Sequence, residues 1–360
     1  MPTIQLVISF TIPFVIVLAM IPLVRSMAVK WKISEKPNGR NNGDIAHLGG
    51  VVIVISVIAG LVPVFLFFLV THSVTAVFLS VLILSGFTIF LLGIIDDLRS
   101  LHYKYKLILQ VIASIFVSVG GIILLSYFSV FEFSTLIRVI LFVIVTLWIL
   151  AITTSFNLID GIDGLAGGIA VVSSISFTVA GLILGQQIVV FLSVIILGSS
   201  LAFLCYNFPP ARIFMGDSGS LFLGLIFGLI SLLFLLPGKD LLFRIAGSIF
   251  ILTVPLLDTT LAFLRRVIKK KSLFQADLSH LHHLLLTRYK SMRKVDFILW
   301  GLAVILGCLG VLTMMGNVAA FIAAVILEIA IFAFSLYVMN SRKAPEESIE
   351  SIIKKHRSTI

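Results

Sequence analysis

The chain has 360 residues, of which 60% are hydrophobic and only 12% are charged, with a net charge of +10 and a mean hydropathy of +1.21. Soluble globular proteins are about 45–50% apolar and about 25% charged, so a water-exposed surface is excluded for most of the chain. The composition predicts an all-α integral membrane protein, and it argues against nucleic-acid binding because the cations lie in loops between apolar segments.

A membrane-spanning helix needs about 20 mostly apolar residues. The sequence predicts about eleven such helices, each continuous, at 4–24, 49–70, 74–95, 107–126, 136–153, 165–185, 187–206, 219–236, 241–263, 296–316 and 318–339.

The loops between these helices divide the charge unequally. On the alternation that eleven spans impose, 23 of the 26 Lys and Arg residues fall on one side. The positive-inside rule makes this side cytoplasmic, with the N-terminus outside and the C-terminus inside. We expect residues 1–340 to form one membrane domain and 341–360 to form a charged cytoplasmic tail.

The first polar cluster on the cytoplasmic side is the adjacent pair Asp96 and Asp97, at the end of the third span. Two neighbouring carboxylates repel each other unless they share a cation or a proton. A solvated helix end is the simpler interpretation, but acidic side chains at a helix C-terminus also oppose the helix dipole. We therefore favour a functional role for this pair.

The second cluster, between the fifth and sixth spans, reads Asn157-Leu-Ile-Asp160-Gly-Ile-Asp163-Gly164. On a helical turn, Asp160 and Asp163 would share a face, and glycine lets the backbone approach a ligand closely. The spacing differs from that of a calcium-binding loop. An ordinary Asp- and Gly-rich turn remains the alternative.

The third cluster leads into the eighth span and contains Arg212, Gly216, Asp217 and Ser218. A helix N-terminus that follows such a loop is a natural site for phosphate or for a metal-bound anion. Asp217 or Ser218 as a plain N-cap is the simpler alternative, and it is compatible with the first.

The fourth cluster lies in the largest cytoplasmic loop and combines cations with histidines. Cations next to a span can simply hold the membrane surface. The histidine spacing allows zinc, but no cysteine or metalloprotease motif supports it. Aspartate and amide oxygens favour Mg²⁺, which often binds substrate phosphates. The residues therefore indicate phosphoryl-type chemistry, and those of this loop are Arg265, Arg266, His280, His282 and His283.

Together these four clusters resemble the polyprenyl-phosphate N-acetylhexosamine-1-phosphate transferase family, of the glycosyltransferase 4 type. The motifs that carry the resemblance are NLIDGIDGLAGG, YNFPPARIFMGDSGSLFLG and SHLHH. The resemblance implies transfer of a sugar-1-phosphate from a UDP-sugar to undecaprenyl phosphate, with release of UMP. It also implies Mg²⁺ as cofactor, with Mn²⁺ as an alternative ion, and a multi-pass protein of the bacterial plasma membrane that acts on the cytoplasmic face.

The resemblance assigns roles to residues of three clusters. It implies that Asp96, Asp97, Asp160 and Asp163 are catalytic, with Asp97 expected to keep the lipid phosphate deprotonated. Asp217 is implied as the best Mg²⁺ ligand, with Asn157 assisting.

The remaining residues are assigned to substrate binding. The histidine motif looks like the branch of the family that uses UDP-N-acetylglucosamine, in the first membrane step of a cell-wall or surface glycopolymer such as teichoic acid. The implied substrate-binding residues are Asn157, Asn207, Arg265, Arg266, His280, His282 and His283.

This sequence departs from the family pattern at Thr154, where members often have asparagine, and in the first cytoplasmic loop at 40–43. The alternatives are a family member that uses another UDP-N-acetylhexosamine, an inactive scaffold, or a membrane transporter. A transporter would place ionisable groups near the bilayer midplane. The expected partners are the UDP-sugar, the polyprenyl phosphate and the lipid bilayer, and a homodimer is left open.

Overall fold

The computed structural model describes residues 3–30, 34–35, 45–71, 73–99, 101–127, 134–234, 240–268 and 280–341. The elements in these ranges are α1 (Thr3–Lys30), β1 (Ser34–Glu35), β2 (Ile45–Ala46), α2 (Gly49–Thr71), α3 (Ser73–Arg99), α4 (Tyr103–Tyr127), α5 (Thr135–Ile159), α6 (Leu165–Ile183), α7 (Gln187–Asn207), α8 (Gly216–Leu233), α9 (Leu241–Ile251), α10 (Thr253–Ile268), α11 (Leu281–Tyr289), α12 (Met292–Met314) and α13 (Val318–Ser341).

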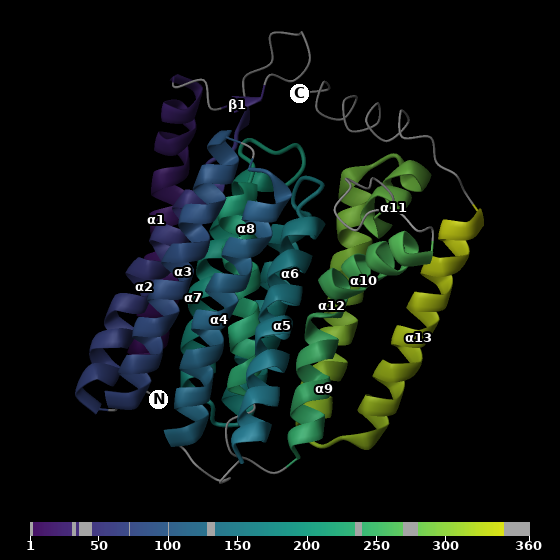
Figure 1. Cartoon of the computed structure of the whole chain (residues 1–360). Helices are drawn as coiled ribbons and strands as arrows, with labels where there is room; N and C mark the ends of the chain where they lie inside the picture. The colour runs from purple at the N-terminus through teal and green to yellow at the C-terminus, as the bar shows by residue number, and fades with distance from the viewer. Residues whose placement is uncertain are drawn as a thin grey trace.

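The protein is a multi-pass membrane protein whose described regular structure is helical apart from one two-stranded ribbon. Ten of the described helices are long and apolar enough to cross a membrane, and α9 with α10 makes an eleventh span when the bent pair is counted as one. The expected eleven spans are therefore confirmed. Apolar runs in lipid become helices because every backbone polar group must be satisfied within the segment. The start of α1 and the end of α13 lie at opposite ends of the bundle (Figure 1).

The ninth span is broken, so the expectation that 241–263 forms one continuous helix is wrong. α9 and α10 meet at Leu252 with a bend of 77°. Pro255 explains the break, because it has no N–H to donate to the carbonyl of Ile251, four residues earlier. At the break, the carbonyl of Ile249 accepts a hydrogen bond from the hydroxyl of Thr253, at 3.0 Å. One half of the span thus follows the bundle axis, and the other half lies across it (Figure 1).

α8 is the central helix of the bundle. Of its residues, 83% are buried, whereas only 17% of the residues in the most apolar part of α13 are buried. α8 packs against α5, α3 and α2, and their ends surround its first turn. The loops and helix ends that carry the polar clusters therefore gather around the start of α8.

The helices α2 and α3 touch the start of α8 through glycines. The backbone N–H of Gly50 donates to the carbonyl of Met215 at 2.7 Å. A Cβ atom on Gly93 would lie only 2.2 Å from the Cα atom of Ser218. Because α3 approaches α8 this closely, Asp97, one helical turn after Gly93, reaches the first turn of α8.

A short ribbon of two strands stands beside the helices. β1 pairs with β2 in an antiparallel ribbon, which the sequence did not predict and which joins Ser34 to Ala46. The altered first loop at 40–43 and nearly all of the predicted tail, 342–360, lie outside the described residues.

The close approach at Gly93 gives a stability prediction. Gly93→Ala is expected to lower the stability of the protein in detergent by about 1–3 kcal/mol, because the methyl group would overlap the α8 backbone. Gly121→Ala, on α4, is the matched control, since nothing lies within 4 Å of a Cβ atom there. Thermal unfolding of both variants measures the difference, and equal melting temperatures would contradict the close packing of α3 on α8.

Candidate active site

A carboxylate from another helix caps the first turn of α8. Asp97 of α3 accepts the backbone N–H of Asp217 at 2.7 Å and that of Ser218 at 3.2 Å, and it also accepts the Ser218 hydroxyl at 2.7 Å. Helix N-terminal N–H groups lack partners within the helix and carry partial positive charge, so a carboxylate stabilises them. The alternative in which Asp217 or Ser218 is itself the N-cap is wrong, because both lie inside the helix.

The Asp217 side chain binds residues of two further helices. Its Oδ1 atom accepts the Asn157 amide, from α5, at 2.9 Å, and the same amide nitrogen donates to the Ser220 hydroxyl at 3.0 Å. Its Oδ2 atom forms an ion pair with the Lys106 ammonium of α4. Lys106 also pairs with Asp96 Oδ2 at 2.9 Å, so this lysine separates and partly neutralises two carboxylates.

The loop between α5 and α6 carries Asp160 and Asp163 in a turn rather than on a helix. Gly164 ends this turn with a φ of +82°, a conformation that glycine adopts at little cost. Its N–H donates to Asn207 Oδ1 at 2.9 Å, and Asp163 Oδ2 accepts the N–H of Ala211 at 3.0 Å. These two bonds hold the loop against residues 207–211, at the end of α7 and in the loop that follows it.

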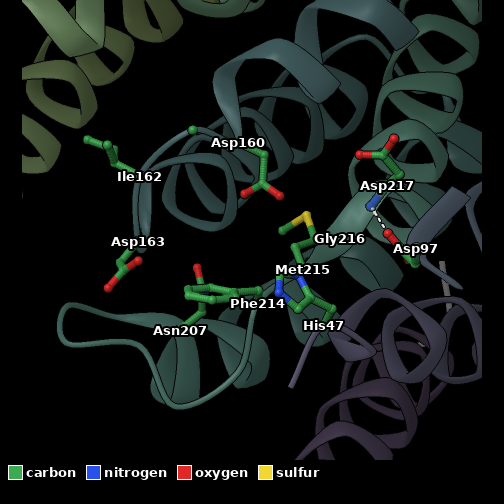
Figure 2. Close-up of a pocket in the computed structure, with 11 residues that line it drawn as sticks. His47, Asp97, Asp160, Ile162, Asp163, Asn207, Phe214, Met215, Gly216 and Asp217 are labelled. Carbon is green, nitrogen blue, oxygen red and sulfur yellow. Dashed lines mark hydrogen bonds between the residues drawn. The ribbon is translucent and has the colours of Figure 1, made fainter. Parts of the chain in front are cut away.

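A cavity of about 270 Å³ lies between this loop and the start of α8. The carboxylate of Asp160 points toward its centre from one side, with Asp97 and Asp217 on the other (Figure 2). Asp163 and Asn207 complete the polar wall, and His47, Phe214 and Met215 close the cavity (Figure 2). The second, third and part of the first sequence clusters therefore meet at one site.

The cavity fits a hard cation. Burial raises the pKa of Asp160 well above its usual range, and the negative charges of Asp97 and Asp163 raise it further. The carboxylates of Asp97, Asp160 and Asp163 thus lie close enough to disfavour one another's charge, which a bound cation would relieve. The polar atoms that face the cavity and could bind a metal are predominantly carboxylate and amide oxygens, which are the ligands that Mg²⁺ prefers.

Asp96 is placed differently from its neighbour. Its Oδ1 atom accepts the N–H of Leu101 at 2.6 Å, and its Oδ2 atom binds Lys106. It is absent from the residues that line the cavity. The two adjacent carboxylates thus point to different partners, and the predicted repulsion is relieved by a lysine and by a helix N-terminus.

The basic and histidine residues of the fourth cluster do not line this cavity. Arg265 and Arg266 lie in the last turn of α10. His280 and His282 turn their Nδ1 atoms toward Asp258 of α10, at 3.1 and 2.9 Å. His283 is buried beside them. Their assignment to substrate binding stays a prediction. The ligands of the zinc alternative change, because the side chains that converge are Asp258, His280 and His282 rather than His280 and His283.

Sequence reasoning missed Lys106 as a site residue and gave His47 no role. A lysine in the first turn of an apolar helix, ten residues after Asp96, was the available signal for Lys106. Thr154, the departure from the family pattern, donates a hydrogen bond to Gln110 of α4 at 3.3 Å. It is not among the residues that line the cavity, so this departure leaves the carboxylates in place.

Similarity to known proteins agrees with these motifs. Residues 78–235 match the model of glycosyl transferase family 4. A probable undecaprenyl-phosphate N-acetylglucosaminyl 1-phosphate transferase of Bacillus subtilis is 37% identical over 292 residues, covering 79% of this chain and 78% of the relative. An undecaprenyl-phosphate alpha-N-acetylglucosaminyl 1-phosphate transferase of Thermotoga maritima is 32% identical, covering 54% and 57%. A phospho-N-acetylmuramoyl-pentapeptide-transferase of Staphylococcus epidermidis is 28% identical, covering 84% and 96%.

A further carboxylate, Asp296 of α12, lies just behind the Asp160–Gly164 turn. Its side chain is fully buried, and neither oxygen has a hydrogen-bond partner among the described residues. A Cβ atom on Gly164 would lie 3.2 Å from its Oδ2 atom. A buried charge without a partner is costly, and groups of this kind are tolerated mainly near functional sites.

We expect Asp296→Asn to raise the stability of the protein in detergent by about 1–3 kcal/mol, because folding forces the carboxyl to bury an unpaired charge or to take up a proton, and the amide does neither. Thermal unfolding near neutral pH measures this change. Asp240→Asn, at the exposed start of α9, is the control. A lower melting temperature for Asp296→Asn would contradict this account.

Proposed function

Because the chain belongs to glycosyl transferase family 4, the polyprenyl-phosphate N-acetylhexosamine-1-phosphate transferases, we propose that it transfers N-acetylglucosamine-1-phosphate from UDP-N-acetylglucosamine to undecaprenyl phosphate. The names of its Bacillus subtilis and Thermotoga maritima relatives support the acceptor lipid and the sugar. The observation that carries the proposal is the oxygen-lined cavity at the start of α8, with Lys106 bound to Asp217 at its side.

In the proposed reaction, an oxygen of the lipid phosphate attacks the β-phosphorus of the nucleotide sugar. The bond from that phosphorus to the oxygen bridging the two phosphates breaks, and UMP leaves with this oxygen. Such transfer needs positioning and charge neutralisation more than covalent help from the protein. Mg²⁺, held by Asp217 with Asn157 assisting, would neutralise the negative charge on the diphosphate.

Lys106 supplies the protein's own cation at this site. Its ammonium group lies between Asp96 and Asp217, so a short movement would bring it to a phosphate oxygen. We assign to it the stabilisation of the charge that builds up on the transferring phosphate.

The base role expected for Asp97 fits Asp160 better. Both oxygens of Asp97 already accept hydrogen bonds from the start of α8. The Asp160 carboxylate points into the cavity (Figure 2), where it could accept a proton from a bound phosphate. A phosphate near neutral pH needs little such help, so we assign Asp160 a supporting role and Asp97 the positioning of Asp217.

The proposed location is the cytoplasmic face of a bacterial plasma membrane, at the first membrane step of a cell-wall or surface glycopolymer. The support is the excess of Lys and Arg on the side that carries the clusters. The transporter alternative finds less support among the described residues. In its favour, Glu328 of α13, hydrogen-bonded to Thr253, is a carboxylate well inside a span. Against it, the cavity carboxylates gather at one end of the bundle.

The reaction can be tested with purified protein, UDP-N-acetylglucosamine, undecaprenyl phosphate and Mg²⁺. We expect metal-dependent release of UMP, and Asp217→Asn should reduce the rate at least about 100-fold because it removes a metal-binding charge. Asp240→Asn, remote from the cavity, should keep the wild-type rate. Release of UMP at the wild-type rate by Asp217→Asn would exclude the assigned metal ligand, and no release with any UDP-sugar would exclude the reaction.

Replacement of Lys106 should separate turnover from metal binding. Lys106→Met is expected to lower kcat about 100-fold or more, since it removes a charge that stabilises the transition state. It should also lower the Mg²⁺ concentration needed for half-maximal rate several-fold, because Asp217 loses its competing cation. A Mg²⁺ titration of UMP release measures both effects, with Lys104→Met, exposed on the same helix, as the control. A raised Mg²⁺ requirement would contradict this role.

A further inference from the structure

A buried hydrogen-bonded cluster joins the broken span to the start of α11. The Oδ2 atom of Asp258, on α10, is within hydrogen-bonding distance of the Nδ1 atoms of both His280 and His282. Its Oδ1 atom accepts the backbone N–H of Leu281. Both carboxylate oxygens are therefore in use, and the His282 ring is held in a fixed orientation by its Nδ1 atom.

The opposite edge of the His282 ring faces the loop that carries Asp160 and Asp163. His282 is only 1% exposed, and its Nε2 atom has no hydrogen-bond partner among the described residues. This atom packs directly onto Gly161, where a Cβ atom would lie only 2.4 Å from Nε2. Gly161 itself lines the carboxylate cavity, between the two aspartates.

The backbone does not explain why residue 161 is a glycine. The φ angle of Gly161 lies outside the left-handed region, so an L-residue could adopt the same backbone conformation. Gly164, three residues later, has a φ of +82°, which favours glycine, and a Cβ atom there would lie 2.8 Å from the Pro209 ring. At Gly161 the three nearest atoms that a Cβ would meet all belong to the His282 ring.

We propose that His282 is a positioning residue which, held by Asp258, sets the position of the Asp160–Asp163 loop through its contact with Gly161. This inference rests on the proposed function and deepens it, because it gives His282 a role behind the cavity wall instead of on the substrate. Small displacements of catalytic groups are costly, and about 1 Å can reduce a rate 100-fold. The contact also ties the half of the broken span that lies across the bundle to the reacting groups.

A bound cation is the rival explanation of the same cluster. The ligand atoms of Asp258, His280 and His282 lie within 4.8 Å of one another, and two imidazoles with a carboxylate can hold zinc. The hydrogen bonds favour the positioning role, because the carboxylate is already satisfied by three N–H donors. Metal analysis of the purified protein decides the point: bound zinc near one equivalent that is lost in His280→Ala would overturn the hydrogen-bonded cluster.

The steric contact gives a test by compensation. Gly161→Ala should lower kcat at least about tenfold, because the methyl group displaces the loop from His282. His282→Asn should lower kcat less, since its amide keeps a donor for Asp258 while the space over Gly161 opens. In the double variant, the alanine occupies this space, so its kcat should equal or exceed that of His282→Asn. His282→Ala, alone and with Gly161→Ala, repeats the test without the donor.

Gly164→Ala is the matched control. Its loss of activity would come from backbone strain and from a Cβ contact with Pro209, neither of which involves His282, so His282→Asn should not restore it. The proposal would be overturned if the kcat losses of the two single variants multiplied in the Gly161→Ala/His282→Asn protein. It would also be overturned if His282→Asn left kcat unchanged and raised the KM for the UDP-sugar, because that result indicates direct substrate binding. The wild-type protein is assayed first, so failure of the proposed reaction is seen before any variant is compared.

Discussion

The cap that Asp97 places on α8 is the interaction on which the rest of the site depends. In lipid or in a protein interior, the free N–H groups at the start of a helix have no water to bind. Here they are satisfied by a carboxylate from α3, which in turn requires the two helices to touch at Gly93. Asp217 lies in the capped turn, so its position is fixed by the same contact. The central helix of the fold, α8, therefore also carries the centre of the site in its first turn.

Around this turn, each polar group has a structural and a chemical use. Asn157 connects α5 to Asp217, and Asn207 holds Gly164 while donating to the carbonyl of Ile213 at 2.9 Å. These bonds arrange the backbone, and they also leave carboxylate charge facing one cavity. The arrangement suits a reaction in which the protein contributes position and electrostatics to a highly charged substrate.

The sequence predicted the eleven spans and the carboxylates of the cavity, because hydropathy and the position of charge are properties of the chain alone. It could not predict contacts between distant helices. The cap from Asp97 to α8 and the pairing of Lys106 with Asp217 join residues more than a hundred positions apart. The break at Leu252 had a local signal in Pro255, but the length and high overall apolarity of 241–263 matched those of a single continuous span. The histidines were conspicuous in sequence, yet their direction depends on Asp258, which a pattern of residue types does not reveal.

The broken span also has a consequence for the order of biosynthesis. α10 leaves the ribosome with Asp258 inside an otherwise apolar stretch, and the groups that bind this carboxylate follow 22 to 24 residues later. Until those residues emerge, the bare carboxylate opposes entry of α10 into lipid. The ninth span is therefore expected to reach its final position only after the start of α11 has been synthesised. The assembly of this region is then a late event in the insertion of the chain.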